Sequence, residues 1–240
     1  MLDNDLLEKR LSKWIGYGNL QSDFWMLGME EGGEVNRKMI NVRLSLPEVG
    51  DWHHAMEKMA EAGGIENKWI RAHPSLQPTY YKIIRIFLIA TGRDSPNLKE
   101  KARKFQRDQF GRKGGDHLVA ELMPLHNHNQ SHWIYNRFSN RPDLSSREAY
   151  MRKWLGRRIK LFRELIEEYD PKVVLAYGKG YWDHFKLLGE RKFKEILDGF
   201  AQTDGRIVLI PHPTAKGLKN SDFDEVGNWI KENIYSSRLL

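Results

Sequence analysis

The stretch Val-Val-Leu-Ala-Tyr-Gly (173–178) follows a long helical pattern that ends at Asp170-Pro171, and it is apolar up to its final two residues. Proline cannot continue a helix, so the chain leaves the helix there and enters a short apolar run. Three further runs of this kind occur at 24–28, 118–124 and 207–211. Mostly continuous apolar runs of this length indicate strands that are buried on both faces, as in a parallel sheet.

Helical patterns separate these runs. The clearest of these patterns, over 151–169, places apolar residues at three- and four-residue spacing. Alternation of strands and helices predicts an α/β protein, a three-layer α/β/α sandwich around a central, mostly parallel four-stranded sheet. We expect a single domain over 1–240, in which 29–117 is a long helical crossover between the first and second strands. The expected helices are 52–62, 80–91, 151–169, 181–188 and 222–234.

The composition excludes several classes of protein. The 240 residues are 40% hydrophobic and contain no cysteine, which excludes disulfides, thiolate nucleophiles and a four-Cys iron–sulfur cluster. No apolar run is long enough to span a bilayer and the first residues are charged, so we expect no membrane partner and a cytoplasmic monomer. With 39 Lys+Arg against 32 Asp+Glu, the formal charge of +7 favours a polyanionic partner.

Polar residues follow each expected strand. The first strand leads into Met-Glu-Glu-Gly-Gly (29–33), and the second contains Glu121 and opens into His-Asn-His-Asn-Gln-Ser-His (126–132). The third leads into Gly-Lys-Gly (178–180), and the fourth into His-Pro-Thr-Ala-Lys-Gly (212–217). Ligand sites of such sheets lie beyond the carboxyl ends of the strands. A carboxylate and an imidazole at neighbouring strand ends can activate water and stabilise a departing anion.

The order of these motifs resembles the uracil-DNA glycosylase superfamily, whose members have a water-activating loop after the first strand and a His-Pro-Ser-type loop after the last. The resemblance covers most of the chain from 24 to 234 and is strongest over 169–188 and 207–218. It implies an enzyme that needs no cofactor, flips a nucleotide out of double- or single-stranded DNA and hydrolyses its N-glycosidic bond.

The resemblance also implies roles for individual residues. Glu30 matches the carboxylate that orients water and stabilises the sugar cation, and Glu31 is an adjacent alternative. His212 would donate a hydrogen bond to the base oxygen as negative charge develops there. Thr214 and Lys216, on the same loop, would contact phosphates or the minor groove.

Two departures from the family pattern bear on the base. Gly32 stands where uracil-specific members have a tyrosine that blocks groups at C5, so a C5 substituent has room. Glu121 stands where uracil readers have an asparagine, and an ionised glutamate would accept from the N4 amine of cytosine. Alternatively, Glu121 is an inward strand residue paired with a nearby His or Arg. Taken together, Gly32 and an ionised Glu121 favour a cytosine with a bulky C5 group. This is similar to the anti-phage DNA glycosylases of the same superfamily, which remove glucosylated hydroxymethylcytosine.

The remaining candidates concern DNA and base contacts. Arg107, Arg112 and Lys113 precede the second strand and, with Lys179 after the third, are expected to neutralise phosphates. On the loop after the second strand, the expected base-recognition residues are His126, Asn127 and His128. A zinc site at the three histidines of this loop (126, 128 and 132) is disfavoured because alternating loop histidines have no fixed geometry, so we expect no metal.

Several alternatives stay open at this point. No lysine is placed for Schiff-base chemistry, which favours a monofunctional hydrolase. The protein could instead be a uracil-DNA glycosylase of base-excision repair, a hydrolase of small nucleosides, or a DNA-binding module that kept the fold and lost the reaction.

Overall fold

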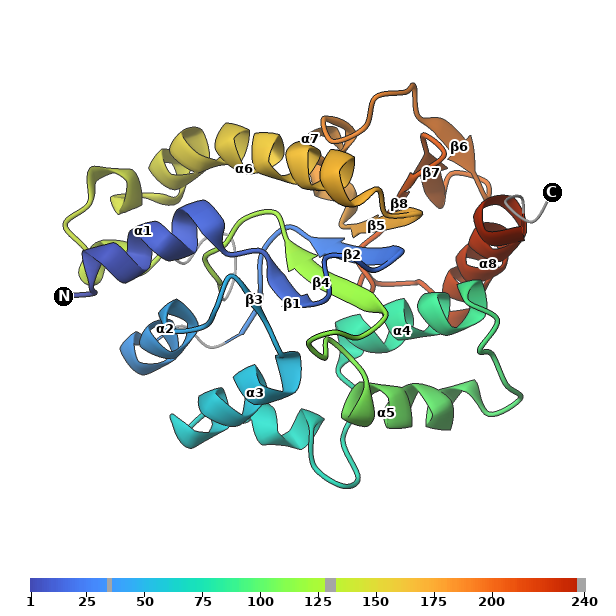
Figure 1. The fold of residues 1–240 in the computed structure, drawn as a ribbon, viewed down its shortest axis with the longest axis horizontal. Helices are drawn as coiled ribbons and strands as arrows, with labels where there is room; N and C mark the ends of the chain where they lie inside the picture. The colour runs from blue at the N-terminus through green and yellow to red at the C-terminus, as the bar shows by residue number, and fades with distance from the viewer. Residues whose placement is uncertain (34–35, 128–132, 237–240) are drawn as a thin grey trace.

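A mixed sheet of eight strands, in the order β3-β1-β4-β2-β5-β8-β7-β6, forms the centre of the molecule (Figure 1). The computed structural model describes residues 1–33, 36–127 and 133–236. The strands are β1 (Gly16–Gly18), β2 (Phe24–Gly28), β3 (Val49–Gly50), β4 (His117–Glu121), β5 (Val173–Tyr177), β6 (Lys194–Ile196), β7 (Ala201–Thr203) and β8 (Ile207–Ile210).

The α/β class is confirmed, and the four strands expected from the apolar runs are the neighbours β4, β2, β5 and β8, which pair in parallel. The expectation of a four-stranded sheet was wrong. The strands β1 and β3 extend the sheet beyond β4, and β7 and β6 extend it beyond β8, with antiparallel pairing at β1–β4, β7–β8 and β6–β7. These added strands are two or three residues long and include Gly-Tyr-Gly and Lys-Glu-Ile, so no apolar run marks them.

Helices cover both faces of the sheet (Figure 1). The α-helices are α1 (Asn4–Lys13), α2 (Arg37–Leu44), α3 (Trp52–Glu61), α4 (Pro78–Ala90), α5 (Leu98–Asp108), α6 (Arg147–Tyr169), α7 (Trp182–Lys186) and α8 (Asn220–Ile230). Short 3₁₀ turns are η1 (Glu66–Trp69), η2 (Tyr135–Arg137), η3 (Pro142–Leu144) and η4 (Lys179–Tyr181), and the π-helical turn η5 (Lys231–Tyr235) extends α8.

The alternation of side chains along the strands divides the core into two halves. In β2, Phe24 packs edge-on against Phe87 of α4, with ring centroids 5.1 Å apart, on the face that α3, α4, α5 and α8 cover. Its neighbour Trp25 lies on the other face, 6.3 Å from the ring of Tyr169 in α6. The central strands are therefore buried on both sides, which explains their continuous apolar sequence.

The segment between β2 and β4 contains several helices, as expected, together with β3. It runs through α2, β3, α3, η1, α4 and α5. The helix α4 begins where the side chain of Gln77 accepts a hydrogen bond from the backbone of Tyr80 at 2.7 Å, with Pro78 in its first turn. Trp52, the first residue of α3, is buried. This crossover brings residues 52–80 to the same side of the molecule as the carboxyl end of β2.

Backbone hydrogen bonds continue past the ends of β2 and β4. Leu122 donates to Gly28 at 2.8 Å, Met123 to Met29 at 2.7 Å, and Asn127 to the carbonyl of Glu31 at 2.9 Å. The turns that follow the two strands therefore lie side by side at one edge of the sheet.

The longest helix, α6, begins at the side-chain cap of Ser146 and ends at Asp170, which has a left-handed backbone with φ 44° before Pro171. No helix within the described residues combines the length and the apolar character needed to cross a membrane.

Candidate active site

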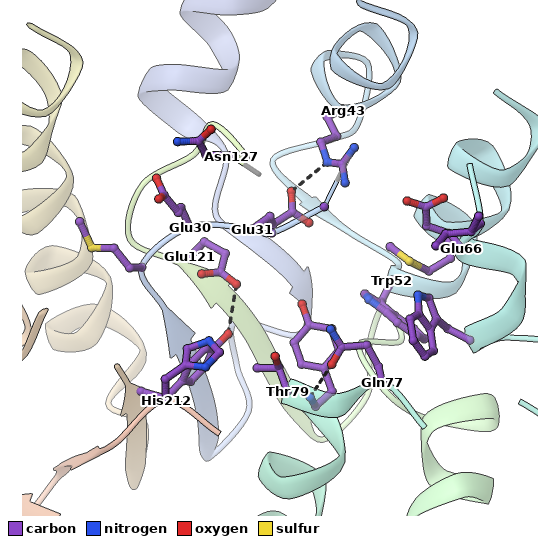
Figure 2. A pocket seen from close by; sticks show the side chains of 18 of the residues that line it. Glu30, Glu31, Arg43, Trp52, Glu66, Gln77, Thr79, Glu121, Asn127 and His212 are labelled. Atoms are coloured by element: carbon purple, nitrogen blue, oxygen red, sulfur yellow. Dashed lines mark hydrogen bonds and ion pairs between the residues drawn. The ribbon is translucent and has the colours of Figure 1, made fainter. Parts of the chain in front are cut away.

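A cavity of about 530 Å³ lies at the carboxyl ends of the parallel strands (Figure 2). Its lining comes from two parts of the chain, the turns after the strands and the crossover. The structure brings together at this cavity six of the residues expected to form the site, which are Glu30, Glu31, Gly32, Glu121, Asn127 and His212. The crossover contributes, among others, Arg43, Trp52, Met56, Glu66, Trp69, Gln77 and Tyr80.

Glu30 lies in the turn after β2 and pairs with a residue at the start of α6. Its Oε1 accepts from Nη2 of Arg147 at 2.8 Å, whereas its Oε2 is buried and contacts no hydrogen-bond donor of the described residues. Burial raises the pKa of the Glu30 carboxyl, and the charge of Arg147 opposes that shift. One oxygen of Glu30 is therefore fixed while the other is available to the cavity.

Glu31, its neighbour, is held by three side chains. Arg10 donates to its Oε2 at 2.9 Å, Tyr17 donates to its Oε1 at 2.7 Å, and Nε of Arg43 lies 3.5 Å from Oε2. The two arginines and Glu31 are all nearly inaccessible to solvent. The adjacent carboxyl groups thus have different surroundings, a single ion pair for Glu30 and a buried ion-pair network for Glu31.

Glu121 ends β4 and is paired with neither a histidine nor an arginine side chain among the described residues. The hydroxyl of Tyr177 donates to its Oε1 at 3.1 Å. Burial, reinforced by the charge of Glu31, raises the pKa of Glu121 well above its usual range, against the effect of the Tyr177 hydrogen bond. This shift favours the neutral carboxylic acid, which can both donate and accept, over the ionised glutamate expected from the sequence.

Gly28 makes room for this pair of side chains. A Cβ atom on Gly28 would lie 2.1 Å from Oε2 of Glu121 and 2.5 Å from the hydroxyl of Tyr177. The glycine at the end of β2 is therefore needed for close approach, and it lets the acid of β4 and the phenol of β5 meet across the strand between them.

His212 follows β8 at the mouth of the cavity, with its ring 6.0 Å from that of Tyr177. The backbone N–H of Thr214 donates to Nδ1 of His212 at 3.3 Å, and the Thr214 hydroxyl lies 2.9 Å from the same nitrogen. A nitrogen that accepts carries no proton, so the neutral ring has its proton on Nε2. Partial burial lowers the pKa of His212, which favours this neutral form.

Buried polar atoms without hydrogen-bond partners gather at this cavity. Such atoms are rare in folded proteins, because each loses its hydration without compensation. Considering only the parts of the chain that are described, the cavity-lining examples are Oε2 of Glu30, Glu66 and Glu121, Nε and Nη1 of Arg43, and Nδ2 of Asn127. Their concentration in one place indicates a site built to bind a polar ligand.

One of the expected base-recognition residues, His126, is not among the described residues that line the cavity. The His126 ring is buried and its Nδ1 lies 2.9 Å from the hydroxyl of Tyr135, away from the cavity lining. The burial and the contact identify it as a residue that supports the loop. His128 and the rest of 128–132, which includes the last of the three loop histidines, lie outside the described residues.

The expected DNA-binding residues divide into two groups. Lys179, Thr214 and Lys216 are exposed and follow β5 and β8, so they lie at the same edge of the sheet as the cavity. Arg112 and Lys113 instead precede β4 at the end away from Glu121, and Arg112 pairs with Asp51 at 3.0 Å.

Arg107, in the last turn of α5, pairs with Asp108 at 2.6 Å and donates to the carbonyl of Ala72 at 3.0 Å. The structure therefore does not place Arg112 and Lys113 at the mouth of the cavity, and it engages Arg107 in local contacts.

Sequence reasoning missed several residues of the site. Tyr177 is the last residue of β5 and lies within the expected strand run 173–178. Its hydroxyl near the end of a strand was the one sign in the sequence that it could belong to the site. Arg147 directly follows the Ser146 cap of α6, and no local motif connects it with Glu30. Glu66 and Trp69 lie in a 3₁₀ turn of the crossover, where no strand end indicated a site.

Comparisons of the chain with protein-family models, with curated proteins and with solved structures give no match in any of the three. The fold and the cavity define an α/β protein with a polar site at the carboxyl ends of its parallel strands. The chemistry of that site is the basis for its proposed function.

Proposed function

We propose that this chain is a monofunctional DNA glycosylase, a three-layer sandwich of the uracil-DNA glycosylase type, that excises a C5-modified cytosine and leaves an abasic site. The favoured base is glucosylated hydroxymethylcytosine of phage DNA. The observation that carries the proposal is that Glu30, which follows β2, and His212, which follows β8, line one cavity although β5 lies between these strands. At about 530 Å³ the cavity has the size of pockets that enclose whole small molecules.

Glu30 is the proposed group on the sugar side. With Oε1 bound to Arg147, its Oε2 is free to hold a water molecule and to face the positive charge that develops on the sugar. As the C1′–N1 bond breaks, its electron pair leaves on the base, the water oxygen adds to C1′, and Glu30 accepts the water proton. The network around Glu31 leaves no oxygen similarly placed, which favours Glu30 over Glu31.

His212 is the proposed group on the base side. Its Nε2–H would donate to O2 of the pyrimidine, where the electron pair from the broken bond is delocalised. A neutral imidazole fixed through Nδ1 by Thr214 supports this assignment, because the donor is oriented before the reaction begins.

Glu121 is the proposed reader of the base. A neutral carboxylic acid can donate to N3 of cytosine and accept from its N4 amine, but it can equally donate to O4 of uracil and accept from N3. Glu121 therefore recognises a pyrimidine edge without deciding between the two bases. An added Cβ at Gly32 would meet no atom of the described residues within 4 Å, and this open space supports a substituent at C5.

Lys179 and Lys216 are the proposed phosphate contacts, because both are exposed at the edge of the sheet where the cavity opens. Extrusion of the base from a duplex, or its capture from a single strand, would bring the flanking phosphates to this edge. Affinity for DNA should accordingly fall as the salt concentration rises.

The test uses DNA of one sequence that contains uracil, 5-methylcytosine, hydroxymethylcytosine or its glucosylated form, followed by alkaline cleavage of abasic sites. We expect cleavage of the glucosylated DNA by the wild type and none by His212→Ala. Cleavage of uracil DNA alone would assign the uracil reaction instead. Salt-sensitive binding with no cleavage of any DNA would identify a non-catalytic DNA-binding module.

A further inference from the structure

The cavity extends well beyond the residues that would act on a pyrimidine. Figure 2 shows Glu30, Glu121 and His212 on one side of the cavity, and Trp52, Glu66 and Gln77 on the other, with Arg43 between the two sides. We refer to the part lined by Trp52, Glu66 and Trp69 as the crossover chamber, because all three residues belong to α3 and η1 of the crossover.

The crossover chamber combines apolar rings with an unsatisfied acid. Trp52 is held rigidly, since its ring packs edge-on against Phe110 with centroids 5.2 Å apart. Glu66 is 9% exposed, and its buried Oε2 has no hydrogen-bond partner in the described portion of the chain. A Cβ on Gly64 would lie 1.9 Å from that oxygen, so the glycine is needed for the close approach of the carboxyl group. Buried acids are seldom left without a donor, so this oxygen is an acceptor that a ligand of the cavity can use.

The chemistry of the crossover chamber fits an uncharged group that carries hydroxyls. Indole rings offer flat apolar surfaces, and a carboxylate accepts hydrogen bonds from hydroxyl groups. The acid at Glu66 would repel a phosphate or a carboxylate that entered the crossover chamber. A pyranose ring has both features that the chamber matches, an apolar C–H face and a rim of hydroxyls.

The expected orientation of the base also directs its C5 substituent toward the crossover chamber. Positions C2 and C5 lie opposite each other across a pyrimidine ring. A base whose O2 faces His212 therefore directs its C5 substituent away from His212, toward the other side of the cavity. Gly32 leaves room for that substituent, because an added Cβ there would meet none of the described atoms within 4 Å.

We propose that the crossover chamber is a subsite for a neutral hexosyl group attached at C5 of the flipped base, with Glu66 and Trp69 as specificity-determining residues, an inference that rests on the DNA glycosylase function proposed above. Glu66 accepts from the sugar hydroxyls, and the partly exposed indole ring of Trp69 packs against the face of the sugar.

The test compares two DNAs that differ only in the sugar, glucosylated hydroxymethylcytosine and hydroxymethylcytosine. The variants are Glu66→Gln and Trp69→Leu, and the matched control is Glu61→Gln, which changes an exposed acid at the end of α3. Loss of a hydrogen bond to a charged group corresponds to a change of about 10- to 100-fold. We expect Glu66→Gln to lower kcat/KM for the glucosylated DNA by that factor. Trp69→Leu, which removes an aromatic contact, should lower it by about 2- to 10-fold. Each variant should lose less on hydroxymethylcytosine DNA. Equal losses on both DNAs, or no loss on either, would overturn the subsite.

A binding measurement separates this proposal from the catalytic one. Glu30→Gln protein should bind glucosylated DNA more tightly than hydroxymethylcytosine DNA, and adding Glu66→Gln should remove that preference. If the wild type cleaves neither DNA, the catalytic proposal fails. The binding preference still tests whether the crossover chamber binds the sugar. Equal affinities of the Glu30→Gln protein for both DNAs overturn it.

Discussion

The two ends of the cavity are built in different ways. The end with Glu30, Glu121 and His212 is formed by turns directly after parallel strands, and backbone hydrogen bonds such as Leu122 to Gly28 (2.8 Å) hold those turns together. The other end is formed by helices of the crossover, whose positions depend on side-chain packing. In the proposed function, the strand ends act on the pyrimidine and the crossover binds its substituent. Reaction and selectivity would then belong to separate parts of the chain.

The largest expected effect is the loss of turnover when Glu30, at the strand end of the cavity, is replaced. Glu30→Gln keeps a hydrogen bond to Arg147 but cannot accept a proton from water, so turnover should fall by about 100- to 10,000-fold while DNA affinity is retained. Glu148→Gln, which changes an exposed acid beside Arg147, is the control. The measurement is single-turnover cleavage together with DNA affinity. A Glu30→Gln protein with normal turnover would contradict the role of Glu30.

The second prediction concerns the acid next to it. Glu31→Gln leaves two buried arginines without their counter-charge, and removing one partner of a buried ion pair costs about 3–5 kcal/mol. Urea denaturation should show this loss of stability. Glu8→Gln, which breaks an ion pair of an acid that is 52% exposed, should change stability by about 1 kcal/mol or less. Similar small losses for both variants would show that Glu31 is not structural.

The third prediction tests how the base-reading acid is accommodated. Gly28→Ala places a methyl group 2.1 Å from Oε2 of Glu121. Overpacking of this kind costs about 1–3 kcal/mol and should also weaken binding of the base, because Glu121 and Tyr177 must separate. Gly180→Ala is the control, since an added Cβ there meets nothing within 4 Å. Thermal unfolding and DNA affinity measure both effects, and unchanged values for Gly28→Ala would contradict the close approach.

The smallest effect concerns pH. The proposed reaction requires Glu30 to be ionised and His212 to be neutral, so activity should rise with pH through the pKa of each group. The pKa of Glu30 is raised by burial and lowered by Arg147, whereas the pKa of His212 is lowered by burial. Removing the positive charge in Arg147→Gln raises the pKa of Glu30 further, and the acid limb of kcat/KM should move to higher pH. The exposed control Arg152→Gln should leave the limb in place, and a limb that does not move in Arg147→Gln would exclude this coupling.

The sequence predicted one end of the cavity better than the other. Glu30, Glu121 and His212 could be grouped because apolar runs reveal the central strands, and parallel strands place their carboxyl ends together. The short edge strand β6, with the sequence Lys-Glu-Ile, buries little apolar surface and left no such pattern.

Two properties of the site depend on tertiary packing and could not be predicted. The raised pKa of Glu121 follows from complete burial, reinforced by the charge of Glu31, and sequence alone gives neither the burial nor the neighbours. The position of Glu66 depends on how η1 lies against the rest of the crossover, and residues of that kind have no fixed spacing from a strand end.

The placement of the crossover between β2 and β4 bears on how selectivity could be engineered. Residues 52–80 form one continuous segment, and the backbone bonds that align the two turns involve residues outside it. Under the proposed function, replacing this segment would change which C5 groups the cavity admits and would leave Glu30, Glu121 and His212 in place.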